Sequence, residues 1–160
     1  MDARRALGIF ARAACLCAVL QPVPAIAGQA TSAMRVSLTV KPTCAVEASP
    51  MSFDGRDGSA IDAESTIAMT CNTDVAANIV LDWGVNSAGA QRRLAGESGL
   101  VPYAIYADAG RQTEWNAASP VSVSTDRGSL QLVAYGRVEA ASTGGMAGSF
   151  ADTVLVTIDF

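Results

Sequence analysis

The chain has 160 residues, with 11 basic and 15 acidic side chains, four cysteines and no histidine, and half of the residues are hydrophobic. This length suits one domain rather than two. The lack of histidine removes the commonest general base and the Ser-His-Asp arrangement, and the acidic balance argues against nucleic acid or an anionic membrane surface as a partner.

Residues 1–27 have the features of a secretory signal peptide. Arg4 and Arg5 give a basic start, the apolar run ALGIFARAACLCAVL follows, and AIA at 25–27 is a small-x-small cleavage site. A membrane anchor is the alternative, but the uninterrupted apolar stretch is shorter than the roughly 20 residues that a bilayer requires. We therefore expect export, with cleavage before Gly28 and no stable membrane insertion.

Removal of this segment changes the charge and the cysteine count. Three of the 11 basic residues and one of the 15 acidic residues lie within 1–27, so the mature chain has a net charge near −6. Cys44 and Cys71 remain, and two cysteines in an exported chain of this size are most simply one disulfide. A metal site would need further ligands, so we expect no metal and no other cofactor.

The mature chain has the pattern of β-structure throughout. Short runs rich in valine, isoleucine, threonine and aromatic residues are separated by clusters of glycine, asparagine, aspartate and serine. A turn signal about every 10–15 residues suits an antiparallel sandwich. DAESTIAM at 62–69 could form a helical turn, but a strand running into Cys71 fits better. The predicted strands are 34–48, 52–55, 65–73, 77–85, 100–108, 121–125, 129–140 and 149–160.

The first and last of these runs each present one apolar face. Pro42 breaks the first run because it has no backbone donor. From the residues alone, 34–40 could simply be the first strand of its own sandwich, or it could belong to no sheet of its own. The apolar face of the first run consists of Met34, Val36, Leu38 and Val40, and that of the last run includes Val154, Val156, Ile158 and Phe160.

Several motifs, in this order and spacing, resemble a known family. They are Cys44 followed by Phe53, STIAMTC ending at Cys71, IVLDWG, RRLAG leading to VPYAIYAD, Trp115, YGRVEA, and the ending AGSFADTVLVTIDF. Together they resemble the spore coat protein U domain, a family shared with the subunits of archaic chaperone–usher pili.

The resemblance implies an immunoglobulin-like sandwich that lacks its final strand. In such pilins the missing strand leaves a groove, which a periplasmic chaperone fills first and the N-terminal extension of the next subunit fills afterwards. It implies a domain over 43–160 and a donor extension over 28–42 that inserts Met34, Val36, Leu38 and Val40. The partners implied are neighbouring subunits, a periplasmic chaperone and an outer-membrane usher, with a final location on the cell surface. On this hypothesis the chain stops at Phe160 because its next strand belongs to another molecule.

Two other functions stay open. The protein could be a secreted coat or matrix protein whose own N-terminal segment closes its groove, or an exported soluble binding protein or hydrolase on a complete sandwich. Signals for chemistry are weak, and we expect no enzyme. The cluster Asp54, Asp57, Asp62 and Glu64 misses the EF-hand spacing and favours solvated loop charge.

Three further features favour structural roles. Arg92 and Arg93 could form an anion site, but we expect surface charge. The five aromatic residues could form a sugar-binding platform, but core positions are more usual. Gly136, within a predicted strand, indicates a bulge or a close backbone approach. The aromatic residues are Trp83, Tyr103, Tyr106, Trp115 and Tyr135.

Overall fold

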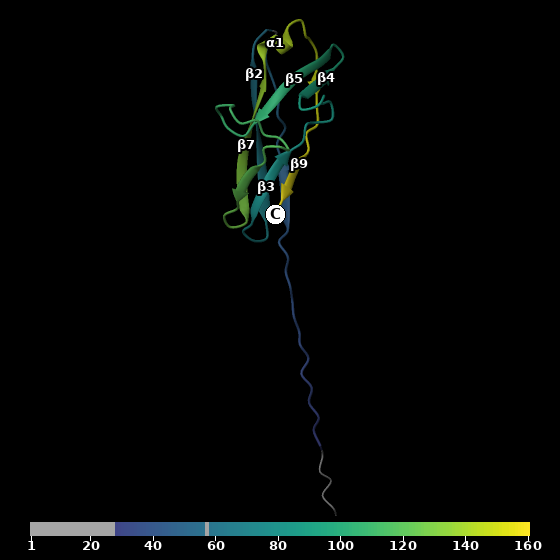
Figure 1. Cartoon of the computed structure of the whole chain (residues 1–160), viewed down its shortest axis with the longest axis vertical. Helices are drawn as coiled ribbons and strands as arrows, with labels where there is room; N and C mark the ends of the chain where they lie inside the picture. The colour runs from purple at the N-terminus through teal and green to yellow at the C-terminus, as the bar shows by residue number, and fades with distance from the viewer. Residues whose placement is uncertain (1–27, 57) are drawn as a thin grey trace, which may run out of the picture. The chain divides into compact units, whose positions relative to one another are not determined.

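The computed structural model describes residues 28–56 and 58–160 (Figure 1). The signal peptide predicted over 1–27 lies outside the described residues. The chain divides into two units after Leu38. Within the first unit, residues 28–38 have no regular secondary structure and all their side chains are exposed. The predicted boundary between 42 and 43 stays a prediction.

The second unit, from Thr39 to Phe160, consists of two antiparallel sheets and one short helix, α1 (Ala140–Thr143), which confirms the all-β class. Figure 1 shows β3 and β9 side by side near the C terminus, with α1 at the opposite end of the domain. The larger sheet has the order β1 (Cys44–Ala48), β2 (Ile61–Cys71), β7 (Ser129–Val138), β5 (Gly99–Tyr106), β4 (Arg92–Gly96) and β8 (Phe150–Ala151). The smaller sheet has the order β6 (Val121–Ser124), β3 (Ala76–Leu81) and β9 (Val156–Asp159).

The hydrophobic core combines residues from both sheets. Alternate residues of β2 are buried, as expected for a strand with one face on the core. Trp115, which follows β5, is 1% exposed and donates its indole N–H to the carbonyl of Ile79. The fully packed members are Ile67, Ile79, Leu81, Val101, Tyr103, Ile105, Trp115, Ala134 and Val138.

The structure corrects some details of the predicted strands and confirms others. Among the described residues the first strand begins at Cys44, so 34–40 is not the first strand of these sheets. Residues 52–55 form no strand, whereas RRLAG forms β4. The short helix α1 was not predicted. The strand reading of 65–73 is confirmed over 65–71 by β2.

The last predicted strand, 149–160, is two short strands in different sheets. β8 pairs with β4 in the larger sheet, and β9 pairs with β3 in the smaller one. Between them the backbone bonds to the turn that follows β3, because Val85 N donates to Thr153 O and Asp82 N donates to Leu155 O. Residues 150–159 therefore pass from one sheet to the other along one continuous line of partners.

Candidate functional site: an open groove between two edge strands

Two adjoining cavities, with volumes of about 340 and 600 Å³, lie between residues 48–56 and residues 146–156. Both cavities are lined by Met51, Phe53, Leu94 and Asp152, so they form one continuous groove. We call 48–56 its N-terminal wall and 146–156 its C-terminal wall.

The floor of the groove is the hydrophobic core itself. Ile67 and Leu81 are each 2% exposed, yet they line the smaller cavity. The larger cavity includes polar residues such as Asp54, Arg56 and Ser149 in its lining. The groove is thus more apolar at the end near β9 than at the end near α1. The remaining core residues that line the smaller cavity are Tyr103, Ile105 and Ala134.

The C-terminal wall continues into β9, which is an edge strand. The carbonyls of Thr153 and Leu155 point toward the 82–85 turn and accept hydrogen bonds from its backbone N–H groups. Because antiparallel pairing alternates along a strand, the backbone groups of Val154, Val156 and Ile158 point to the opposite, open edge. The side chains of these three residues pack against the core, so this wall offers both hydrogen-bonding groups and apolar surface.

The N-terminal wall continues β1, the edge strand of the larger sheet. Ser49 holds the wall to β2, since its N–H donates to Thr66 O, its hydroxyl accepts from Thr66 N, and its carbonyl accepts from Ser65 Oγ. The predicted disulfide between Cys44 and Cys71 is present, with an S–S distance of 2.04 Å, and it joins β1 to β2 at the other end of the strand.

Two side chains of the N-terminal wall lie over Gly136 of β7. A Cβ atom at Gly136 would overlap the sulfur of Met51 and the ring of Phe53. Phe53 also meets the ring of Tyr103 edge to face, with centroids 5.9 Å apart. The atoms that approach Gly136 are therefore side chains of the wall rather than the predicted second backbone, and only glycine leaves room for them.

Asp152 fixes the C-terminal wall to the floor. Its Oδ2 accepts a hydrogen bond from the hydroxyl of Tyr103 at 2.8 Å, and its Oδ1 accepts from the backbone and side-chain nitrogens of Asn86 at 3.1 and 3.0 Å. Burial, and next the hydrogen bond to Asp152, raise the pKa of Tyr103 well above its usual range. Gly84 has a φ of +78°, and a Cβ atom there would overlap the Asp152 carboxylate.

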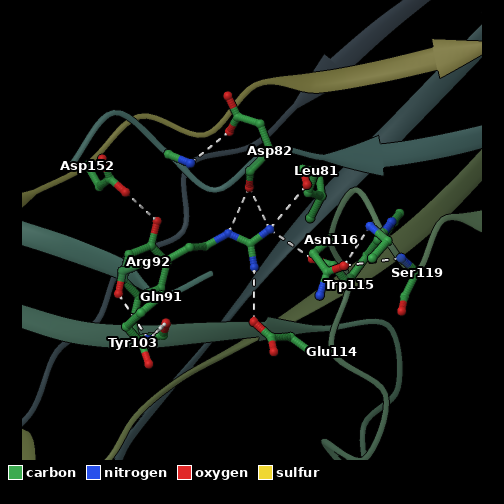
Figure 2. Close-up of polar contacts among 12 residues, drawn as sticks. Leu81, Asp82, Gln91, Arg92, Tyr103, Glu114, Trp115, Asn116, Ser119 and Asp152 are labelled. Atoms are coloured by element: carbon green, nitrogen blue, oxygen red, sulfur yellow. Dashed lines mark hydrogen bonds and ion pairs between the residues drawn. The ribbon is translucent and has the colours of Figure 1, made fainter. Parts of the chain in front are cut away.

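A fully buried arginine supports the same wall from below (Figure 2). The side chain of Arg92 is 0% exposed, and its guanidinium donates to the carbonyl of Asp82 at 2.9 and 2.6 Å and to that of Trp115 at 2.8 Å. Its Nη1 lies 3.6 Å from Glu114 Oε1. The Asp82 carboxylate in turn accepts the N–H of Leu155 at 2.9 Å. Arg92 thus stabilises the turn at Asp82, to which the C-terminal wall is hydrogen-bonded through Leu155.

The environment of Arg92 differs from the predicted surface position. Burial lowers the pKa of the Arg92 guanidinium, and nearby Tyr103 and Glu114 act in the opposite direction. Its Cζ also lies 5.1 Å from the centroid of the Trp83 ring. The prediction of surface charge is therefore wrong for Arg92. Arg93 is only half-buried and donates to the carbonyl of Asn86.

The predicted donor residues and groove residues occupy contrasting environments. Val154, Val156 and Ile158 are half-buried against the core, whereas Phe160 is 55% exposed. The four apolar side chains of the predicted donor segment are almost fully exposed, at 87% for Met34, 85% for Val36, 88% for Leu38 and 72% for Val40. Their assignment to a donor strand and a groove stays a prediction.

In the predicted acidic cluster, Asp62 is engaged in ion pairs. Asp62 forms a bidentate pair with Arg137, at 2.7 and 2.9 Å, and Arg111 Nε lies 3.3 Å from the same carboxylate. The hydrogen bond from Arg137 holds the pKa of Asp62 below its usual value. Asp57 lies outside the described residues. Among residues 28–56 and 58–160, no group of three or more histidine, cysteine, aspartate or glutamate side chains could hold a metal ion.

Sequence reasoning found the apolar faces and the disulfide but missed the N-terminal wall, the Asp152 contacts and the burial of Arg92. The apolar alternation identified Val154 and Val156, whereas residues 49–55 have no such period. The contact of Arg92 with the backbone carbonyl of Asp82 leaves no signal in the sequence.

No helix of the described residues has the length and apolar character that a membrane span requires.

Comparisons with known proteins agree with this architecture. A chain of the CsuC–CsuE chaperone–tip adhesion subunit complex from the archaic chaperone–usher Csu pili of Acinetobacter baumannii matches with a TM-score of 0.62 and 20% identity. That match covers 76% of this chain and 40% of the other, so the present chain spans less than half the length of that relative.

A second solved structure, a chaperone–tip adhesin complex of CFA/I fimbriae, matches with a TM-score of 0.43 and 11% identity over 71% of this chain and 40% of that one. No curated protein matches in sequence. The Spore Coat Protein U domain matches residues 30–157, which is most of the chain. With this match and the sandwich described above, the protein belongs to the Spore Coat Protein U domain family.

Proposed function

We propose that this protein is a structural subunit of a surface pilus or fimbria, assembled by donor-strand exchange. The observation that carries the proposal is the groove, which has an apolar floor and an edge strand along each wall. Open strand edges with exposed core side chains are templates for pairing with another chain. A strand laid in the groove would satisfy both edges at once.

The segment over 34–40 has the properties that this groove requires. Its four apolar side chains alternate with polar ones, so one face would enter the groove while the other faced solvent. Four buried side chains would contribute on the order of 6–12 kcal/mol before ordering costs. Seven extended residues span roughly 23 Å, about the length of a sandwich edge.

The topology allows the inserted strand to pair with both walls. Five successive antiparallel pairs lead from β1 to β8, so β1 and the C-terminal wall run in opposite directions. An inserted strand is therefore antiparallel to one wall and parallel to the other. We favour antiparallel pairing, the slightly more stable kind, with the C-terminal wall, because this wall and β9 together carry the half-buried Val154, Val156 and Ile158.

Charge favours the same association. Residues 28–43 contain Arg35 and Lys41 and no acidic residue, whereas residues 44–160 contain 14 acidic and 6 basic residues. The extension of one molecule is thus attracted to the domain of another. The shared fold with a chain from a chaperone–tip adhesion subunit complex supports a periplasmic chaperone as the first occupant and neighbouring subunits as the next. An outer-membrane usher and a location on the cell surface complete the proposal, which assigns no catalysis.

A charge placed on the inserted face tests this function. Leu38→Asp would place a carboxylate in an apolar pocket, which is costly without a partner. Ser37→Asp puts the same charge on the solvent face of the same segment and is the matched control. Multimers that survive detergent without heating should be lost in Leu38→Asp and kept in Ser37→Asp. Normal multimers from Leu38→Asp, or from a chain lacking 28–41, would contradict the donor assignment.

A further inference from the structure

One residue, Asn72, holds the chain just ahead of β1 on the side that faces β2. Its Oδ1 accepts the N–H of Thr43 at 3.0 Å, and its Nδ2 donates to the carbonyl of Lys41 at 3.1 Å. Its backbone N–H donates to the carbonyl of Thr43 at 3.1 Å. Two residues ahead of Cys44 are therefore tied to the end of β2, and we call this arrangement the Asn72 clamp.

The clamp matters because the open edge of β1 lies on its other side. Thr43 continues the pairing of β1 with β2, and Lys41 is also bonded on the β2 side. To fill its own groove, the chain would have to turn toward the opposite edge of β1 and run back along it as a hairpin. While the clamp is closed, residues 41–43 cannot form this turn, so the turn can lie no nearer to β1 than residues 39 and 40.

The position of the turn decides which residues reach the groove. With a turn at 39 and 40, Leu38 faces Lys41 and Met34 faces Ala45, so the apolar residues stop short of the wall that starts at Ala48. With the clamp open and a three-residue loop over 41–43, Val40 faces Cys44 and Val36 faces Ala48. Only the second register delivers the apolar face to the groove, because hairpin register follows from the turn.

A tethered segment needs such a restraint. A segment joined to its own domain by a short linker has an effective concentration in the mM range, and geometry alone can exclude it. Without a restraint, the chain's own extension would occupy the groove ahead of any other molecule. The clamp would supply such a restraint through geometry alone.

We infer that Asn72 is a positioning residue that keeps the 34–40 segment out of its own groove and leaves it available to the groove of a second copy of this chain. The inference rests on the proposed function. Asn72 would thus favour assembly with a second copy over closure of the groove by the chain's own segment. Both side-chain bonds of Asn72 are solvent-exposed, so the clamp is a modest bias that a conformational change can release.

Hydrogen exchange in the monomer tests the inference. The mature chain would be kept dilute, and exchange of the amide hydrogens of Val36, Leu38 and Val40 would be measured in the wild type and in Asn72→Ala. Asn72→Asp keeps the acceptor for Thr43 N but loses the donor to Lys41 O, so it isolates one bond. Gln131→Ala removes an exposed amide from β7 and is the control.

We expect fast exchange in the wild type and in Gln131→Ala, and slower exchange by about tenfold in Asn72→Ala, as expected from the loss of two hydrogen bonds. Asn72→Asp should lie between them, and multimer yield should fall in the same order. Equal exchange in the wild type and Asn72→Ala, or protection already present in the wild-type monomer, would overturn the inference. A different result would contradict the proposed function itself. In that case the amides of Val36, Leu38 and Val40 would exchange fast even in wild-type multimers, where donor-strand exchange should protect them.

Discussion

Tyr103 and Asp152 are joined by a 2.8 Å hydrogen bond at the side of the groove, in which the phenol of β5 donates to the carboxylate of the C-terminal wall. Tyr103 is 5% exposed and belongs to the core. Asp152 lines both cavities of the groove. The bond therefore ties the edge at which a further strand would pair to the rigid floor beneath it.

Removal of the phenol hydroxyl should loosen this wall. In Tyr103→Phe the carboxylate keeps its two bonds from Asn86 but loses its third donor. A hydrogen bond to a charged group contributes about 1.5–3 kcal/mol, so urea unfolding should show a loss of about that size. Tyr135→Phe, on the neighbouring strand β7, is the control and should change stability little. Equal midpoints for both variants would show that the bond is unimportant.

Stability should also fall at alkaline pH because of Tyr103. Burial and the hydrogen bond to Asp152 raise the pKa of Tyr103 in the folded chain, whereas a tyrosine in the unfolded chain ionises at about pH 10. Above that pH, unfolding releases a proton, so the free energy of unfolding decreases as pH rises; below it, this contribution is fully present. Urea midpoints from pH 8 to 11 should decline above about pH 10 in the wild type. The decline should be much smaller in Tyr103→Phe, with a remainder from Tyr106, whose pKa burial also raises.

Arg92 and Arg93 offer a matched pair of substitutions. In Arg92→Met, the carbonyls of Asp82 and Trp115 lose a charged donor, and the turn that holds Leu155 loses its support. Removing one member of a buried ionic network typically costs about 3–5 kcal/mol. Arg93→Met loses one bond, to Asn86, from a half-buried side chain and should cost about 1 kcal/mol. Urea unfolding measures both, and similar losses would mean that the burial of Arg92 has no special role.

The sequence predicted the fold best where one strand face meets the core. β2 and β7 could be recognised because alternate residues are apolar and β-branched or aromatic residues are frequent. The predicted strands did not include β4, because two adjacent arginines suggest an exposed loop. Only the fold shows that Arg92 lies buried beneath the 82–85 turn. The division of the last run into β8 and β9 depends on contacts with Asp82 and Val85, which are far away in the sequence.

The groove could be predicted only in part for a similar reason. Alternation marked Val154, Val156 and Ile158 as one face, and the structure places them against the core. The N-terminal wall has no period, because Met51 and Phe53 are positioned by the space above Gly136 rather than by their neighbours in sequence. The Asn72 clamp is likewise a long-range contact, between residues about 30 positions apart.

The space above Gly136 can be tested directly. In Gly136→Ala, the new methyl group would overlap the ends of the Met51 and Phe53 side chains, which must then move away from the sheet. Overpacking of this kind costs about 1–3 kcal/mol, and we expect a loss of that size in urea unfolding. Gly144→Ala is the control, because Gly144 has a φ of −56° and no atom near its Cβ position. A Gly136→Ala variant as stable as Gly144→Ala would mean that the wall is not packed on β7.

Association between the extension and the groove should depend on salt. The extension carries Arg35 and Lys41 without any acidic residue, and the domain carries an excess of acidic residues. Electrostatic attraction of this kind speeds encounter and is screened beyond about 8–10 Å at physiological salt.

Stopped-flow mixing of a peptide of residues 28–43 with a chain lacking 28–41 measures the rate. Between about 50 and 500 mM salt we expect a decrease of several-fold, since rim charges act mainly on the association rate. A peptide with Arg35→Gln and Lys41→Gln should bind more slowly and lose most of the salt dependence, while its four apolar side chains keep dissociation slow. Arg127→Gln in the domain is the control, because it increases the negative charge and should not slow binding. A salt-independent rate for the unmodified peptide would show that apolar contacts alone guide the segment to the groove.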